Sequence, residues 1–335
     1  QTYRDDGTGS PIATFGPNYF DENNSGANNA FALKQASITI AKQPSDGFGA
    51  LVNLTTGSDA TFIHSNGAGA NDYDVTQAFV QYAGSGLTVI GGKFNTLAGA
   101  EVIAPTGNTN ISRSIAFLNA LPFTHTGVRV SYAPASNVTL YLGSNNGWDA
   151  QKDTNKSKTT ELGISFTPTD MISAAVYAYS GGEGSPAQTR TLIDTVITIK
   201  PTKELALVLN YDMGQQKEAS TNLVTGAAEN AKWDAINVYV NYQFTDKLRT
   251  SLRLEQFNDK GVVFSSPGVA SSYRLGLTDG ADPVKKVNGV TLTLGYAAAD
   301  NFELRGEVRQ DKADKEVYSE DGTSFTSKQM YFAVE

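Results

Sequence analysis

The chain has 335 residues, no cysteine and a formal net charge of −8, and its mean hydropathy is −0.28. The absence of cysteine excludes disulfides, thiolate metal sites and cysteine nucleophiles. No run of about 18 apolar residues occurs, which argues against a transmembrane helix, and the acidic balance argues against a nucleic-acid partner.

The first 30 residues are rich in Gly, Asn, Asp and Pro, and we expect a loop entered from the end of a short strand near residues 1–4. Because no apolar leader precedes this loop, we expect a mature chain whose export signal has been removed. From residue 31 onward, apolar and polar residues alternate in successive segments, which is typical of strands with two unlike faces. The predicted strand pairs are 31–43 with 48–56, 75–82 with 87–94, 125–132 with 138–144, 158–167 with 172–179, 189–200 with 205–213, 231–244 with 248–258, and 287–296 with 302–310, followed by a last strand at 328–334.

The pattern is clearest in residues 231–258. Ile236, Val238 and Val240 alternate there with polar residues, and after a Thr-Asp-Lys turn leucines alternate with charged residues. Strands of soluble proteins usually run about five or six residues, whereas these run about ten, the length that a tilted strand needs to cross a bilayer. The hairpin therefore predicts one unit of a transmembrane β-barrel, with its apolar face toward lipid and its charged face toward a water-filled lumen.

The links between the predicted strands alternate between short and long. Short links fall near residues 45, 85, 135, 169, 202, 246 and 299. Long links fall at 57–74, 95–124, 145–157, 180–188, 214–232, 258–286 and 312–327. Short turns at one rim and long loops at the other are typical of outer-membrane barrels, in which the long loops lie outside the cell.

Fifteen strands can be counted in the sequence. A closed barrel needs one more, because an open edge in lipid leaves backbone groups unpaired. We therefore predict a single domain over residues 1–335, an all-β transmembrane antiparallel up-and-down β-barrel of 16 strands whose remaining strand comes from the N-terminus. The last residue is Glu335 rather than the aromatic that typically ends such barrels, so we expect incomplete terminal strands.

Residues 91–129 carry a resemblance to a known family. They read G-G-K-F-N-T-L-A-G-A-E-V-I, then N-T-N-I-S-R-S, then P-F-T-H-T-G-V-R, and an earlier hairpin contains Gln35 and the segment D-G-F-G at 46–49. In these motifs the chain resembles the β-barrel porin-2 (OmpL-like) family of Gram-negative outer membranes. The resemblance implies a passive porin and, more loosely, a homotrimer. The family has no defined catalytic or binding residues to carry over.

The alternation also predicts which charged residues face the lumen. An Arg or Lys on the lipid face near the midplane would cost about 2–4 kcal/mol, which favours the inward assignment most strongly for Arg129, Arg253 and Arg305, well inside their strands. Facing charges of both signs would order water and favour some polar solutes. The alternative is a wall of ion pairs without selectivity. The predicted inward residues are His125, Arg129, Glu161, Arg190, Asp194, Asn210, Asp212, Arg249, Arg253, Glu255, Glu303, Arg305, Glu307 and Arg309.

Residues 95–124 are the candidate constriction loop. The segment is long, follows a short strand that contains Lys93, and carries Glu101 and Arg113, a mixture of charges suited to narrowing an aqueous lumen. The alternative is an external loop that packs on a neighbouring subunit, and the apolar residues of the segment suit either arrangement.

Aromatic residues near the strand ends are predicted to form the two interfacial girdles of a barrel. They are Tyr132, Phe166, Tyr179, Tyr211, Trp233, Tyr242, Phe244, Tyr296, Phe302 and Phe332. The rival interpretation is a sugar-stacking track, for which the inward-facing Tyr239 is the candidate.

Signals for an enzyme are poor. The histidines are His64 and His125 alone, and no metalloprotease, serine-hydrolase or phosphate-loop motif occurs. Asp72 and Asp74 would suit a Ca²⁺ ion, but no further ligands follow at an ordered spacing. We expect no catalytic residues, no metal and no cofactor.

The sequence thus predicts a porin in the outer membrane of a Gram-negative bacterium, which forms a water-filled channel for passive diffusion of small polar solutes and ions. The expected partners are outer-membrane lipids, lipopolysaccharide, the permeating solutes and further copies of the chain in a homotrimer. Two alternatives stay open: a non-conducting structural or adhesive barrel that binds partners through loops 214–232 and 258–286, and a soluble all-β binding protein. The net charge of −8 weakly favours cations.

Overall fold

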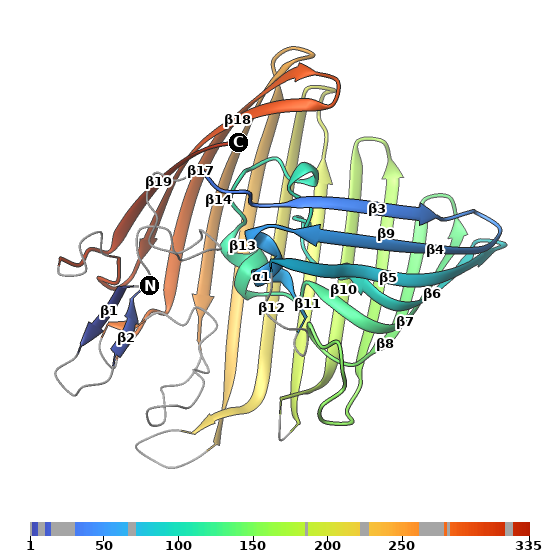
Figure 1. Ribbon diagram of the computed structural model, residues 1–335, viewed down its shortest axis with the longest axis horizontal. Coiled ribbons are helices and arrows are strands. Elements are labelled where there is room, and N and C mark those ends of the chain that lie inside the picture. Colours follow the sequence, from blue (N-terminus) through green and yellow to red (C-terminus); the bar gives the residue numbers. More distant parts are fainter. Residues whose placement is uncertain are drawn as a thin grey trace. The chain divides into compact units, whose positions relative to one another are not determined.

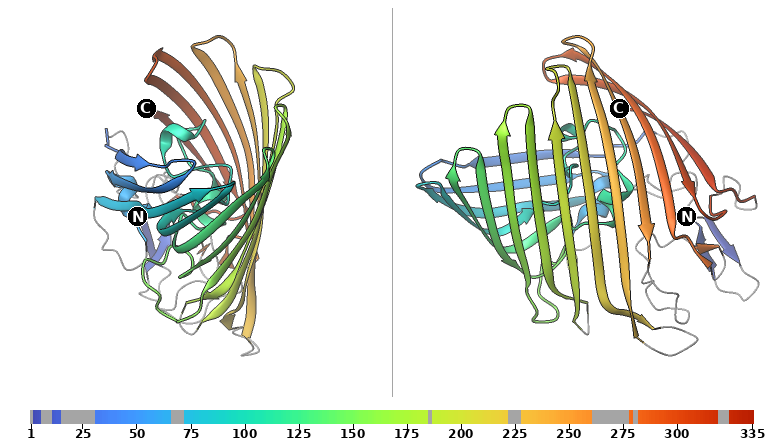
Figure 2. Two further views of the ribbon diagram at one scale, coloured as in Figure 1. Left: turned by 90° about the vertical axis from the view of Figure 1, so that its right-hand side faces the viewer. Right: turned by 180° about the vertical axis from the view of Figure 1, so that it is seen from behind.

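The computed structural model describes residues 2–5, 11–14, 31–65, 72–184, 187–221, 228–260, 278–279, 282–318 and 324–335. The chain falls into two compact units. The N-terminal unit contains Ala30–Pro105 and Leu121–Ile197, and the C-terminal unit contains Gln1–Asn29, Thr106–Ala120 and Thr198–Glu335. Figures 1 and 2 show that the strands of the main sheet in each unit follow one another in chain order.

The N-terminal unit is built from antiparallel strands, each hydrogen-bonded to the next. They are β3 (Ala36–Lys42), β4 (Gly47–Thr56), β5 (Tyr73–Gly84), β6 (Leu87–Asn95), β7 (Thr124–Ala135), β8 (Val138–Asn145), β9 (Thr159–Thr169), β10 (Ile172–Glu183) and β11 (Gln188–Ile199). The register keeps apolar residues opposite one another, as in the pair Ile38 and Leu54. Helix α1 (Ser58–Ile63) lies in the link between β4 and β5 and contacts both strands.

The C-terminal unit continues the same pattern. Its long strands are β12 (Leu205–Thr221), β13 (Ala228–Gln243), β14 (Leu248–Asp259), β17 (Lys286–Ala299), β18 (Phe302–Ala313) and β19 (Lys328–Val334). Two separate two-stranded sheets are formed by β1 (Thr2–Asp5) with β2 (Pro11–Thr14) and by β15 (Thr278–Asp279) with β16 (Asp282–Pro283). The short helices η1 (Pro105–Gly107) and α2 (Ile115–Asn119) lie in the candidate constriction loop.

The predicted all-β, antiparallel up-and-down arrangement is confirmed. The described residues contain fifteen strands in that order, one fewer than the predicted sixteen. The N-terminal segment expected to supply the remaining strand forms β1, which pairs with β2 in a separate sheet.

Two strands of the C-terminal unit run further than the apolar alternation indicates. The segment 214–232, predicted as a loop, contains the end of β12 up to Thr221 and the start of β13 from Ala228. Backbone pairing continues there with polar side chains, for example Gln215 opposite Lys232, because ladder hydrogen bonds do not require apolar residues. Most of 1–30 and of 258–286 lies outside the described residues.

The two faces of the C-terminal unit's sheet are the reverse of those in a water-soluble protein. The exposed face carries apolar side chains such as Leu254 and Leu294, which are 42% and 52% exposed. The opposite face carries Arg253, Thr291 and Arg309, each at most 1% exposed. An exposed apolar face of this kind suits lipid surroundings. Among the described residues, no helix has the length and apolar character needed to cross a membrane.

Candidate functional site

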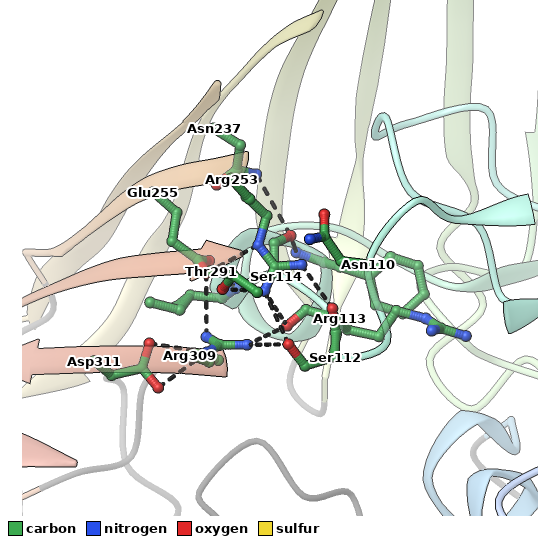
Figure 3. A network of polar contacts seen from close by, with 12 residues as sticks. Asn110, Ser112, Arg113, Ser114, Asn237, Arg253, Glu255, Thr291, Arg309 and Asp311 are labelled. Carbon is green, nitrogen blue, oxygen red and sulfur yellow. Dashed lines mark hydrogen bonds and ion pairs between the residues drawn. The ribbon is translucent and has the colours of Figure 1, made fainter. Parts of the chain in front are cut away.

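The central part of the candidate constriction loop, Thr106–Ala120, lies along the buried face of the C-terminal unit, where two arginines hold its backbone (Figure 3). Arg253 on β14 donates through Nη1 to the carbonyl of Ser112 at 2.6 Å. Arg309 on β18 donates through Nη1 to the carbonyl of Arg113 at 2.7 Å. Both guanidinium groups also donate to the Ser112 hydroxyl, at 3.1 and 3.2 Å. Arginine suits this task because its planar fork serves several acceptors at once.

Two carboxylates hold the amide groups of the same stretch. Glu307 on β18 accepts hydrogen bonds from the backbone N–H groups of Ile111 at 2.7 Å and Ser112 at 3.0 Å. Glu255 on β14 accepts one from the backbone N–H of Ile115 at 2.7 Å. Hydrogen bonds to a charged acceptor are roughly twice as strong as neutral ones. Strands β14 and β18 therefore hold the loop by hydrogen bonds to both the carbonyl and the N–H groups of the loop backbone.

The side chains that hold the loop are also paired by charge. Arg253 Nε lies 3.1 Å from Glu255 Oε1, and Arg309 Nη2 lies 3.2 Å from the same oxygen. Arg309 Nε lies 2.9 Å from Asp311 Oδ1. A buried guanidinium group without a partner would cost several kcal/mol in lost hydration, and these pairs offset that cost. We call Arg253, Glu255, Glu307, Arg309 and Asp311 the anchoring cluster.

A second pair of arginines holds the beginning of the same segment. Arg305 donates to the carbonyl of Asn108 at 3.0 Å. Arg249 donates to the carbonyl of Thr109 at 2.8 Å and makes a two-pronged contact with Glu303, at 2.6 and 2.8 Å. Such bidentate geometry fixes the plane of the guanidinium group and hence the direction in which it holds the loop.

Helix α2 closes the held segment. The Ser114 hydroxyl caps its N-terminus by accepting a hydrogen bond from the backbone N–H of Phe117 at 3.1 Å. At the other end, Trp233 Nε1 donates to the carbonyl of Ala120 at 3.0 Å. The guanidinium carbon of Arg113 lies 5.5 Å from the centre of the Phe117 ring, a cation–π contact. In Figure 3 the Arg113 side chain points away from the strands that hold its backbone.

In the N-terminal unit, a buried ion pair lies beside the first residues of the candidate loop. Arg129 Nε and Nη2 donate to the two carboxylate oxygens of Glu161 at 2.5 and 2.8 Å. Arg129 Nη2 also donates to the carbonyl of Asn95 at 3.1 Å, and its guanidinium carbon lies 4.3 Å from the centre of the Phe94 ring. The hydroxyl of Tyr179 accepts from the backbone N–H of Leu97 at 3.2 Å.

A second group in the N-terminal unit surrounds Trp148. The carboxylate of Glu183 accepts from the backbone N–H of Trp148 at 3.1 Å and from the Thr159 hydroxyl at 2.8 Å. The guanidinium carbon of Arg190 lies 4.8 Å from the centre of the Trp148 ring. Both units thus use charged side chains of their strands to fix adjoining loop segments.

Comparison with protein families matches residues 8–335 to the family described as "Putative beta-barrel porin-2, OmpL-like". The chain belongs to this porin family. It is an outer-membrane β-barrel channel for passive diffusion, which confirms the resemblance, the function and the location predicted from the sequence. A comparison with curated proteins finds no match.

Solved porin structures share the fold at low sequence identity. OmpT, an outer membrane protein of Vibrio cholerae, is 12% identical, with a TM-score of 0.56 over 90% of this chain and 87% of that one. An anion-selective porin from Comamonas acidovorans is 11% identical, with a TM-score of 0.57 over 90% and 83%. OprB of Pseudomonas putida is 9% identical, with a TM-score of 0.57 over 83% and 82%.

The predicted inward residues of this porin all lie on the less exposed face of their strands. Buried are His125, Arg129, Glu161, Asp194, Asn210, Asp212, Arg253, Glu255, Arg305, Glu307 and Arg309, and half-buried are Arg190, Arg249 and Glu303. The structure brings several of them together in the anchoring cluster and in the pairs of Arg249 with Glu303 and Arg129 with Glu161. Glu101 and Arg113 are both buried as well.

Some site residues were missed by the sequence analysis. Asp311 continues the two-residue spacing of Glu307 and Arg309, so the same alternation would have identified it. Lys93 and Asp74 form a buried ion pair at 3.1 Å, so Asp74, which was weighed as a Ca²⁺ ligand, has a cation beside it instead. Within the described ranges, no group of three or more His, Cys, Asp or Glu side chains is arranged to hold a metal ion.

Two aromatics were assigned wrongly to the lipid-facing girdles. Tyr179 and Trp233 are 1% and 2% exposed, and each makes a hydrogen bond on the buried face. These two residues were assigned because they lie near strand ends. Side chains two residues apart on a strand share a face, so Trp233 lies on the same buried face as Ala235.

Proposed function

We propose that this porin passes small polar solutes and ions through a single β-barrel domain whose lumen is narrowed by residues 95–124. The inward residues named above line the pore, and Thr106–Ala120 forms the fixed part of the constriction. The observation that carries the proposal is the grip of the anchoring cluster on the backbone from Ile111 to Ile115. An external loop that packs on a neighbouring subunit would have no need of buried arginines from its own wall.

The buried charges favour a weak preference for cations. Among the described residues, eleven buried carboxylates accompany six buried Lys and Arg side chains, an excess of five acids. Rings of carboxylates attract cations to a pore. Among the described residues, three of these carboxylates, Glu161, Glu255 and Asp311, form ion pairs with arginines, so the net field is smaller than the number of acids suggests.

The assembly we propose is a homotrimer. One solved structure that resembles this chain, with a TM-score of 0.52 and 12% identity, is described as the trimer form of OmpT. In the N-terminal unit, strand β3 is exposed along its whole length, and Ile40 and Phe48 are 71% and 77% exposed. Apolar side chains this exposed suit burial against a second copy as well as lipid.

The decisive experiment is single-channel recording in a planar bilayer under a salt gradient, with the protein's mass in detergent measured in parallel. We expect steady conductance steps, a reversal potential with the sign of cation preference, and a mass three times that of the chain. Absence of conductance from folded, inserted protein would refute the channel and leave the structural or adhesive barrel. A reversal potential of the opposite sign would refute the charge argument alone.

A further inference from the structure

A row of lysines follows the end of the apolar face in the C-terminal unit. On β18 the exposed face reads Leu304, Val308, Gln310 and then Lys312 toward the long-link end. Strands β13, β14, β17 and β19 show the same order, in which an apolar run is followed by a lysine, on most of these strands after one or two amides or an acid. We call this set the lysine band, and it consists of Lys232, Lys260, Lys286, Lys312 and Lys328.

Strand register brings the members of the band together. Lys312 and Lys328 are direct partners across β18 and β19. The backbone N–H of Lys260 donates to the carbonyl of Lys232 at 2.7 Å, so these two are also neighbours. Lys286 lies on β17, between the strands of these two pairs, and is opposite an asparagine of β14. Adjacent strands are about 4.8 Å apart, so successive lysines are within reach of one multivalent anion.

Part of the band is already neutralised by acids. Lys260 Nζ lies 2.5 Å from Asp234 Oδ2, and the backbone N–H of Asp314 donates to the carbonyl of Lys286 at 3.0 Å, which places that acid beside Lys286. Within the described part of the chain, no ion pair is recorded for Lys312 or Lys328. Like charges directly opposite each other destabilise a sheet, so this pair gains from an anion bound between them.

We propose that the lysine band binds the phosphate groups of lipopolysaccharide in the outer leaflet, a proposal that rests on the proposed function through the orientation of the barrel. Long loops face outward in such barrels, which puts the band at the outer-leaflet headgroup level. A phosphorylated lipid fits best because the band stands where the lipid-facing apolar run ends. Its acyl chains lie along residues such as Val290 and Leu292, while its phosphates reach the lysines and the neighbouring amides of Gln256 and Asn288.

The experiment measures binding of bis-phosphorylated lipid A to the full-length protein in detergent by native mass spectrometry. The test variant is Lys312→Gln with Lys328→Gln. The matched control is Lys203→Gln with Lys247→Gln, which removes the same charge from exposed positions in two short turns at the opposite rim. Each lysine near a phosphate contributes about fivefold in affinity, so we expect about 30-fold weaker binding by the test variant and wild-type binding by the control.

Three further arms make the result specific. Lipid A without phosphates should bind wild type and test variant equally weakly, inorganic phosphate alone should give no stable adduct, and Lys312→Arg with Lys328→Arg should restore binding. Equal binding of bis-phosphorylated lipid A by wild type and the test variant would overturn the proposal, as would a stable adduct with inorganic phosphate. Channel conductance measured on the same preparations separates the two proposals, because a protein that conducts without binding lipid A refutes the lysine band alone.

Discussion

Removal of the Glu307 carboxylate tests whether strand β18 holds the proposed constriction loop. Glu307 makes hydrogen bonds to the backbone N–H groups of Ile111 and Ser112, at 2.7 and 3.0 Å, and to the Thr293 hydroxyl. Because none of these partners is a buried cation, Glu307→Ala releases the loop without leaving an arginine unpaired. Each buried hydrogen bond to a charged group contributes about 1.5–3 kcal/mol, so the two loop bonds together contribute about 3–6 kcal/mol.

Loss of these two bonds should raise the fraction of molecules in which the first half of the loop is detached from the strands by about 10²–10⁴-fold. The arginine contacts at Ser112 and Arg113 persist, so the loop fluctuates rather than leaves. We expect Glu307→Ala to show increased open-channel noise and a larger mean conductance in single-channel recordings. The control is Asp246→Ala, which removes one charge from an exposed short turn. If Glu307→Ala folds normally yet matches both wild type and the control in noise and conductance, the anchoring argument fails.

Three other changes probe the same contacts. Arg253→Lys keeps the positive charge but loses the planar guanidinium group, so we expect increased open-channel noise with unchanged ion preference. Open-channel noise equal to that of the wild type would show that the charge alone holds the loop. Arg309→Met leaves Asp311 and Glu255 without the cation that Arg309 supplies to both. We expect the free energy of unfolding, measured by urea denaturation, to fall by about 3–5 kcal/mol. A decrease under about 1 kcal/mol would contradict this expectation. In the exposed link before β9, a hydrogen bond from Lys158 lowers the pKa of Asp153. The ionised Asp153 therefore helps to order this link at pH values above its pKa in the unfolded chain. That contribution is lost as the pH falls through its lower pKa in the folded protein. The Lys156 amide signal, followed by NMR, should therefore titrate below the pH expected for a free aspartate, and titration at the ordinary value would contradict the contact.

The alternation of apolar and polar residues predicted which side chains share a face of the sheet better than it predicted which loop groups they contact. The two-residue phase is set by backbone geometry, so it grouped Arg253 and Arg309 on one face, which is buried, without any knowledge of their partners. It did not indicate that their main partners in the loop are backbone carbonyls, because any residue offers a carbonyl and Ser112 and Arg113 look no different from their neighbours in the sequence.

Strand ends were predicted less well for a related reason. Beyond the lipid-facing region the exposed side chains become polar, so the alternation fades although the backbone ladder continues, as it does to Thr221 on β12. The same fading hid the lysine band. Lys312 lies two residues beyond the predicted end of β18 at residue 310, and only the register shows that it lies opposite Lys328.

Four members of the anchoring cluster hold the loop while their charges offset one another. Arg253 and Arg309 are balanced by Glu255 and Asp311, so these four groups together add little net charge to the lumen. A nearly neutral set of four charges exerts a weak field beyond a few ångströms, and salt in the proposed pore screens it further. Glu307, the fifth member of the cluster, contacts two backbone N–H groups and a hydroxyl, so its charge is not offset in the same way. We therefore expect charge-conserving substitutions in the four paired groups to weaken loop anchoring with little effect on ion preference.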